Sequence, residues 1–321
     1  MGSKVALVRC EDYQQEKVSA AVGEAVKLLG GWERFVGAGE RVLIKPNFIA
    51  PRPPETPAQT DGRLIKEIAR QVGKLGAKVL IGDSTAWGST RKNAGLAGLG
   101  REDLEEVGAE LVKFNRSCRV SIETAGGPAE ARLARAVLEA DKIINVPKLK
   151  SHQQLVYSGA IKNCFGAVAG KRKAWWHFRY SQPVRFADMI VGVYRRVGPV
   201  LNIVDGVVAM EGQGPIGGRA RKLGVVLASA DAAAVDVVGC DLIGIKAEDT
   251  EIWRAARRAG VGTTGVGEIE VVGEEVGALK VKDFAMAEPR PIRFSLLRVI
   301  KSTAKQVRIL LRERMERAGG E

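Results

Sequence analysis

Three side chains that can carry protons alternate along one short segment of this 321-residue chain. Lys148, Lys150 and His152 stand two residues apart in the run NVPKLKSH, and side chains two residues apart in an extended segment point to the same side. Two ammonium groups beside an imidazole suit a carboxylate or a phosphate, and the imidazole can move a proton near neutral pH. The spacing therefore predicts a small-anion site with Lys148 and His152 as catalytic residues. The alternative is a solvated basic edge strand.

Polar clusters also follow other apolar runs of strand length. They are Lys45-Pro46-Asn47 after 41–44, Asp83-Ser84 after 78–82, Asp205-Gly206 after 200–204 and Ser229-Ala230-Asp231 after 222–229. In open α/β sheets, ligands bind outside the carboxyl ends of parallel strands. If these strands are parallel, the clusters share one edge of the sheet and surround one pocket. The ligand-binding residues expected from them are Lys45, Asn47, Asp83 and Ser84, with Lys150 beside them and Asp205 as a third catalytic residue.

The elements that must position these side chains alternate between strand and helix patterns. Strands are expected near 4–9, 41–44, 78–82, 110–114, 141–146, 200–204 and 222–229, and helices near 16–29, 61–75, 102–107, 131–139, 183–196, 232–243 and 248–258. Several of the strands are unbroken Val/Ile/Leu runs, which is typical of strands buried on both faces. The sequence therefore predicts an α/β fold with a mainly parallel sheet flanked by helices.

Two glycine-containing segments add candidates for ligand binding. Lys162 and Asn163 lie between glycines in GAIKNCFG (159–166), and glycine allows a ligand to approach the backbone closely. Neither a P-loop nor a dinucleotide fingerprint is present in the sequence. Residues 209–221 are glycine-rich and are expected to be irregular, either as a mobile ligand loop that includes Glu211, Gly212 and Gly214 or as an ordinary surface loop.

Asp236 lies inside a helical segment, 232–243, that is apolar nearly all round. Such a helix is expected to be buried, and an unpaired buried carboxylate costs several kcal/mol. Asp236 therefore needs a partner and is counted among the ligand-binding residues. The candidate partners are Lys45, Lys148 and Lys162, and the alternative is that Asp236 lies on an exposed edge of the helix.

A metal site is a weaker prediction. Oxygen ligands with one imidazole suit magnesium, manganese or iron, so a divalent metal is one candidate cofactor; the candidate ligands are Asp83, His152, Asp205 and Glu211. The four cysteines are scattered and form no C-x-x-C pair. This spacing argues against a disulfide framework, a zinc ribbon and an iron–sulfur cluster.

The formal charge of +13 predicts an anionic partner or substrate. Basic and aromatic residues interleave in 171–180 (KRKAWWHFRY), which suits single-stranded nucleic acid, or alternatively a lid over the pocket. The tail 293–321 has the pattern of a basic amphipathic helix that either docks on the body or contacts anionic lipid, nucleic acid or a partner. The start of the chain does not resemble a targeting signal, so a cytoplasmic location is expected.

Seven motifs occur in one order along the chain: KPN (45–47), GDS (82–84), NVPKLKSH (145–152), GAIKNCFG (159–166), NIVDG (202–206), MEGQGP (210–215) and the pair Asp231 and Asp236. Over residues 3–275 the chain resembles the family known as domain of unknown function 362. The resemblance implies a prokaryotic α/β protein whose reaction is not established. Some members carry an added iron–sulfur segment, which this chain lacks. The resemblance also implies a shared site formed by Lys45, Asn47, Asp83, Lys148, Lys150, His152, Lys162, Asn163, Asp205, Glu211 and Asp236.

Two functional hypotheses follow. The first is an enzyme, formed by a body over residues 1–288, that binds a small anionic substrate in a pocket lined by Lys, His and Asp at the carboxyl ends of the strands. The second is a single-stranded nucleic-acid-binding protein that uses 171–180 and a basic helix over 289–321. Peripheral membrane contact through that helix is a third, weaker idea.

Overall fold

The structure is a computed structural model that describes residues 2–52, 55–170, 176, 179–180 and 182–288. The expected basic helix over 289–321 and most of the segment 171–180 lie outside the described residues. Among the helices that are described, none is long and apolar enough to span a membrane.

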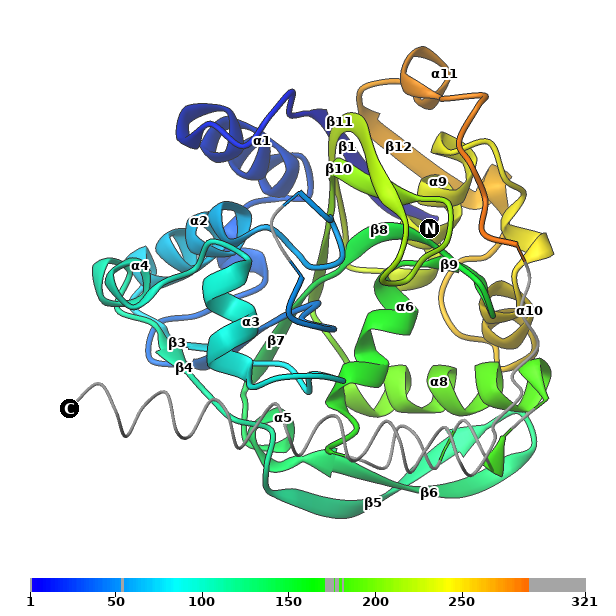
Figure 1. Ribbon diagram of the computed structural model, residues 1–321, viewed down its shortest axis with the longest axis horizontal. Coiled ribbons are helices and arrows are strands. Elements are labelled where there is room, and N and C mark those ends of the chain that lie inside the picture. Colours follow the sequence, from blue (N-terminus) through cyan, green and yellow to red (C-terminus); the bar gives the residue numbers. More distant parts are fainter. Residues whose placement is uncertain (1, 53–54, 171–175, 177–178, 181, 289–321) are drawn as a thin grey trace.

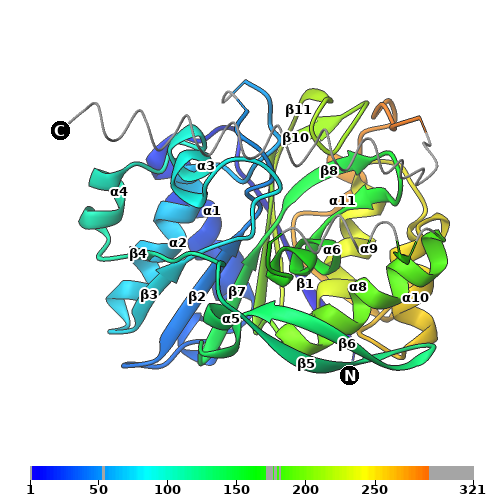
Figure 2. The ribbon, with the colours of Figure 1, turned by 60° about the horizontal axis from the view of Figure 1, so that its bottom comes forward.

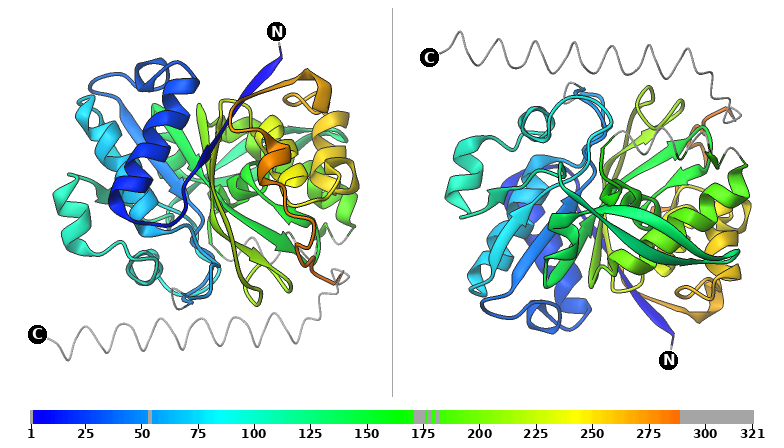
Figure 3. Two further views of the ribbon diagram at one scale, coloured as in Figure 1. Left: turned by 90° about the horizontal axis from the view of Figure 1, so that it is seen from above. Right: turned by 90° about the horizontal axis from the view of Figure 1, so that it is seen from below.

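A mainly parallel sheet forms the centre of the molecule (Figures 1 and 3). Its main path runs in the order β12-β1-β11-β10-β7-β2-β3-β4, and β8 and β9 extend it from β10. The strands are β1 (Ser3–Arg9), β2 (Arg41–Pro46), β3 (Lys78–Ile81), β4 (Glu110–Leu111), β7 (Lys142–Val146), β8 (Lys148–His152), β9 (Val156–Ser158), β10 (Leu201–Glu211), β11 (Arg219–Ser229) and β12 (Ile269–Gly273). The predicted α/β class and the parallel core of the sheet are confirmed.

Strand β11 departs from the prediction because it runs antiparallel to both β1 and β10. Its carboxyl end lies beside the start of β10, where Ser229 pairs with Asn202, in the same row as Asn145 of β7 and Lys45 of β2. The cluster at Ser229 and Asp231 therefore follows an antiparallel strand, whereas the prediction assumed that it follows a parallel one. Asp231 instead caps the helix α9 (Ala232–Leu242), where its carboxylate accepts hydrogen bonds from the amides of Ala233 and Ala234.

Helices cover both faces of the sheet (Figure 3). On one face, α1 (Gln15–Leu28) and α2 (Gly62–Lys74) bury apolar side chains against β1, β2 and β3. On the other face, α6 (Ala160–Asn163), α8 (Pro183–Val197) and α9 share a second apolar cluster. The remaining helices are α3 (Thr90–Leu96), α4 (Arg101–Glu106), α5 (Arg135–Leu138), α10 (Glu251–Arg258) and α11 (Val276–Leu279), with 3-10 turns at Trp32–Arg34, Cys164–Ala167, Ala247–Asp249 and Val266–Glu268.

A two-stranded hairpin lies beneath α8 where a helix was predicted (Figure 2). The first four residues of the segment 131–139 belong to β6 (Gly127–Ala134), which pairs antiparallel with β5 (Ser117–Thr124), and only the next four, in α5, are helical. Exposed and less exposed residues alternate along both strands, so the period is that of a half-buried strand. Gly192 of α8 allows close packing there, since a Cβ at this position would lie 2.8 Å from the Glu123 carbonyl oxygen.

The glycine-rich segment 209–221 is also more regular than predicted. Its two ends pair within β10 and β11, from Ala209 opposite Arg221 to Glu211 opposite Arg219. Only the residues between these strands form the turn. The glycines between Glu211 and Arg219 therefore form a hairpin turn, and the residues on either side of the turn belong to β10 and β11.

The sheet splits where β7 continues into β8 (Figure 2). The first half of β10 pairs with β7, and residues farther along β10 pair with β8, so that Asp205 lies opposite Lys148. Strand β2 pairs with β7 only as far as Pro46 and Val146. Pro147 marks the division between β7 and β8, and its carbonyl accepts the amide hydrogen of Asp205. Beyond this point β8 pairs with β10, and β2 no longer pairs with this part of the chain.

Candidate active site

Lys148 forms a buried ion pair with Asp205. The Lys148 Nζ lies 2.9 Å from the Asp205 Oδ2, and both side chains are at most 2 % exposed. Tyr13 completes the group: its hydroxyl accepts from Lys148 at 2.6 Å and donates to the Asp205 Oδ1 at 2.7 Å. The amide of Asp61 gives Asp205 a further hydrogen bond at 3.0 Å. Both charges are therefore compensated within the fold.

Lys45 and Asp83 form a second buried ion pair, between the ends of β2 and β3. Their Nζ and Oδ1 atoms are 2.9 Å apart, and the Asp83 Oδ2 accepts the amide hydrogen of Phe48 at 2.8 Å. Gly166 lies against this pair, because a Cβ at Gly166 would be 2.5 Å from the Lys45 Nζ. The predicted glycine-containing segment thus packs directly on the predicted charged cluster. Ser84 follows Asp83 and donates its amide hydrogen to the Gly166 carbonyl at 3.3 Å.

Lys150 differs from these two lysines because both of its acceptors are neutral oxygens. Its Nζ donates to the Asn47 Oδ1 at 2.5 Å and to the Ala58 carbonyl oxygen at 2.9 Å, and the side chain is 1 % exposed. Within the described part of the chain, no carboxylate forms an ion pair with Lys150. Burial lowers the pKa of this amine well below its usual value, and the positive charges of Lys162, Lys148 and Lys45 lower it further.

Four asparagines connect Lys150, across the strands of the sheet, to the carboxyl end of β11. Each amide nitrogen donates to the next oxygen, from Asn47 to Asn163 at 2.8 Å, from Asn163 to Asn145 at 2.8 Å and from Asn145 to Asn202 at 2.9 Å. Asn202 in turn donates to the Ser229 carbonyl at 3.1 Å. Because the Asn47 nitrogen is engaged with Asn163, its oxygen is the atom presented to Lys150.

Asp236 is buried, as predicted, but its partners are not lysines. Its two carboxylate oxygens accept the amide hydrogens of Ala160 at 2.6 Å and Ile161 at 3.0 Å, so Asp236 caps the short helix α6. Of the predicted partners, Lys45 pairs with Asp83 and Lys148 with Asp205 instead, and two backbone N–H groups satisfy the Asp236 carboxylate. Burial raises the pKa of Asp236 to about 7, and the two N–H groups oppose that rise.

Lys45, Lys148, Lys150 and Lys162, with the side chains that contact them, are called the lysine cluster below. Glu211, Gly212 and Gly214 anchor the β10–β11 turn rather than line this cluster. Glu211 accepts from the Arg219 side chain at 2.8 Å and from the Ala285 amide at 3.0 Å. The Gly212 carbonyl accepts the Ser151 hydroxyl hydrogen at 2.7 Å, and Gly214 lies so close to the Ser151 carbonyl that a side chain there would collide with it. These residues therefore hold the turn against β8.

His152 and Lys162 take up different positions around β8. The Nδ1 of His152 accepts the amide hydrogens of Gln154 at 3.1 Å and Leu155 at 3.3 Å. Nδ1 therefore carries no proton in this geometry, and Nε2 is the nitrogen that can bear one. Lys162 is half-buried on α6, close enough to Lys150 to act on its pKa.

The four predicted metal ligands are not brought together. Asp83 binds Lys45, Asp205 binds Lys148, and Glu211 binds Arg219, each at a separate place. Over the residues that the structure describes, no group of three His, Cys, Asp or Glu side chains is placed to hold a metal ion.

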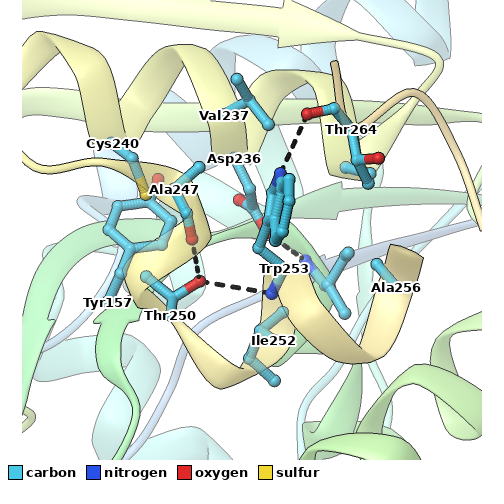
Figure 4. Close-up of a pocket in the computed structure, with 12 residues that line it drawn as sticks. Tyr157, Asp236, Val237, Cys240, Ala247, Thr250, Ile252, Trp253, Ala256 and Thr264 are labelled. Carbon is cyan, nitrogen blue, oxygen red and sulfur yellow. Dashed lines mark hydrogen bonds between the residues drawn. The ribbon is translucent and has the colours of Figure 1, made fainter. Parts of the chain in front are cut away.

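A small pocket lies beside α9 and α10, and none of the described lysines lines it (Figure 4). Of the predicted site residues only Asp236 lines it, together with Tyr157, Cys240, Trp253 and other side chains that are mostly apolar. The Trp253 indole donates to the Thr264 carbonyl at 2.9 Å, which holds the ring in the pocket wall. This pocket does not correspond to the predicted Lys/His/Asp-lined one.

Several residues of the lysine cluster were not predicted. Tyr13 follows β1, so the rule that directs attention to the carboxyl ends of parallel strands would have found it. Asn145 and Asn202 are polar residues inside otherwise apolar strands, a pattern that indicates a buried hydrogen-bonding role. No sequence signal identifies Ala58, which contributes a backbone carbonyl.

Replacing Asp236 by asparagine is expected to change how stability depends on pH. The pKa of Asp236 is about 7 in the folded state and 3.8 in the unfolded chain. The stabilisation that comes from its protonated form is therefore fully present below pH 3.8 and is lost as the pH rises to about 7. The difference in unfolding free energy between wild type and D236N should therefore fall by up to about 1.4 kcal/mol per pH unit across this range. Urea titrations of both proteins measure it, and a difference that stays constant contradicts the assignment.

Comparison with known proteins places the chain in a family. The model for the domain of unknown function DUF362 matches residues 42–241. A thylakoid-associated protein of Synechocystis sp. is 34 % identical over 310 residues, which cover 95 % of this chain and 94 % of that protein.

Two solved structures are distant matches to the fold. The lactate racemase apoprotein from Thermoanaerobacterium thermosaccharolyticum is 12 % identical with a TM-score of 0.44, and the match covers 72 % of this chain and 54 % of that one. A protein from Thermotoga maritima is 13 % identical with a TM-score of 0.42, covering 63 % and 52 %. The match thus spans about half the length of each solved structure. The family model and the relative from Synechocystis agree with the motifs in the sequence: the chain belongs to the DUF362 family.

Proposed function

We propose that the chain is an enzyme that binds a small carboxylate or phosphate beside β8 and uses Lys150, as a neutral amine, for the reaction. The observation that carries this proposal is the environment of Lys150: a fully buried amine with two neutral acceptors and three lysines close enough to lower its pKa. A buried amine among cations is a common way to make lysine reactive near neutral pH.

The neighbouring lysines have separate roles in this proposal. Lys148 is held by Asp205 and Tyr13, and Lys45 is held by Asp83, so these two ion pairs position the cluster. The sequence assigned catalysis to Lys148, His152 and Asp205, but the contacts support Lys150 better because its amine, unlike Lys148, has two neutral acceptors and no carboxylate partner among the described residues. Lys162, half-buried on α6, is the residue assigned to the substrate anion.

Calorimetric titration with a panel of small carboxylates and phosphates tests the proposal. At least one anion is expected to bind the wild type, and Lys162→Met is expected to weaken that binding about tenfold or more, in the range seen when one charged partner is removed. Lys27→Met is the matched control, because Lys27 is an exposed lysine of α1 that pairs with Glu24 and with no residue of the site. Absence of anion binding at millimolar concentration, or equal affinity in K162M and wild type, would sink the proposal.

A further inference from the structure

We infer that Lys150 is a nucleophile that forms an imine with a small carbonyl compound carrying a carboxylate or a phosphate. This inference rests on the proposed function and adds to it the class of substrate and the covalent step. It follows from the hydrogen bonds around Nζ, the charges nearby and the charge balance of the product.

The hydrogen bonds around Lys150 match a neutral amine. A neutral amine has two N–H bonds and one lone pair, whereas an ammonium has three N–H bonds. The described structure offers Nζ two acceptors, the Asn47 Oδ1 at 2.5 Å and the Ala58 carbonyl oxygen at 2.9 Å. With both N–H bonds engaged, the lone pair is left over for reaction.

The amide chain keeps Asn47 in the orientation that this arrangement requires. Asn47 could accept a hydrogen from Lys150 or donate one to it, and only the first choice leaves the amine lone pair free. Its nitrogen is already donating to Asn163, whose own nitrogen donates to Asn145. Lys150 therefore donates a hydrogen bond to Asn47, and the lone pair of the Lys150 amine accepts no hydrogen bond from Asn47.

The charges around Lys150 favour the same state. Lys162, Lys148 and Lys45 disfavour a further positive charge at Nζ, and Asp83 opposes them only in part because it is paired with Lys45. Removal from water acts in the same direction, since desolvation disfavours the charged form. An amine held this way attacks carbonyl carbon without first losing a proton.

The reaction balances without any oxidant or reductant. The Lys150 lone pair forms a bond to the carbonyl carbon, the π electron pair of the carbonyl moves to its oxygen, and one proton passes from the nitrogen of the adduct to that oxygen to give a neutral carbinolamine. The hydroxyl then takes a second proton from solvent and leaves as water, while the nitrogen lone pair forms the C=N bond of the protonated imine. The protonated imine is positively charged, so in this buried cationic cluster it needs a counter-charge. An anionic substituent on the substrate supplies it, whereas a neutral aldehyde or ketone would not.

Reductive trapping tests the inference on the full-length chain. The protein is treated with sodium cyanoborohydride and either glyoxylate, 2-oxobutyrate or glycolaldehyde phosphate, with propanal as the neutral comparison, and modified peptides are mapped by mass spectrometry. We expect labelling of Lys150 at least tenfold faster than that of Lys27, saturable in the anionic compounds and slower with propanal. Because mapping is done on the unaltered chain, the result does not depend on whether a variant that lacks Lys150 folds.

The outcomes separate this inference from the proposed function. Labelling spread equally over surface lysines, or none at Lys150 in a protein that still binds an anion through Lys162, overturns the imine and leaves the anion site in place. A protein that binds no anion loses the proposed function as well. Faster labelling with carboxylates than with phosphates, or the reverse, identifies which anion the site prefers.

Discussion

Asp205→Ala is expected to lower the free energy of unfolding by about 3–5 kcal/mol, the cost of removing one partner from a buried ion pair. The substitution leaves the Lys148 ammonium buried with only the Tyr13 hydroxyl as a partner, and it also removes the acceptor of the Asp61 amide. Denaturant unfolding of the variant at neutral pH measures the loss.

The double variant Lys148→Met/Asp205→Ala tests the cause. It removes both charges, so it should be more stable than Asp205→Ala alone, and a double-mutant cycle gives the coupling between the two side chains. Asp283→Ala is the exposed control: it breaks the ion pair with Arg221 at the surface, where such pairs contribute little. If the double variant is less stable than the single one, the uncompensated charge is not what destabilises Asp205→Ala.

Lys150→Met is expected to alter the pH dependence of stability in the alkaline range. Burial among other cations holds the pKa of Lys150 in the folded state well below its ordinary value, whereas in the unfolded chain Lys150 binds a proton up to its ordinary pKa of 10.5. The unfolded state then binds more protons, so the Lys150 contribution to stability rises with pH until about 10.5. As the pH rises toward 10.5, the free energy of unfolding of wild type should increase relative to that of K150M by up to about 1.4 kcal/mol per pH unit.

The control for this measurement is Lys27→Met, which removes an exposed lysine and so reports how much of the change the loss of any lysine would give. Using differences between variants cancels the titration of all other groups. A flat difference for K150M would mean that the folded protein keeps Lys150 protonated, and it would remove the basis for nucleophilic attack.

Much of the fold could be predicted because buried parallel strands leave a strong signal. The runs at 41–44, 78–82 and 141–146 have consecutive Val, Ile or Leu residues at their centre, and each corresponds to a strand of the central sheet. Direction is not encoded in such runs, which is why the antiparallel course of β11 was missed. The hairpin of β5 and β6 was missed because its strands are only half-buried and rich in charged residues.

The site could be predicted in composition but not in detail. The rule for strand ends correctly brought together Lys45 with Asp83 and Lys148 with Asp205. The partner of Asp236 could not be predicted, since α6 has four residues and leaves no periodic pattern. The lowered pKa of Lys150 could not be predicted either, because it depends on which oxygens contact Nζ, and one of these belongs to the backbone of Ala58.

The four asparagines between Ser229 and Lys150 have a consequence for how this region can rearrange. If one amide turned over alone, like atoms would face each other at both of its contacts, two oxygens on one side and two NH2 groups on the other. The four side chains must therefore keep their orientation or reverse in concert. A backbone carbonyl can only accept, so Ser229 fixes the sense of the whole series. The orientation of the Asn47 amide that faces Lys150 is thus set by a backbone carbonyl at the end of β11, a strand that reaches Lys150 only through these four side chains.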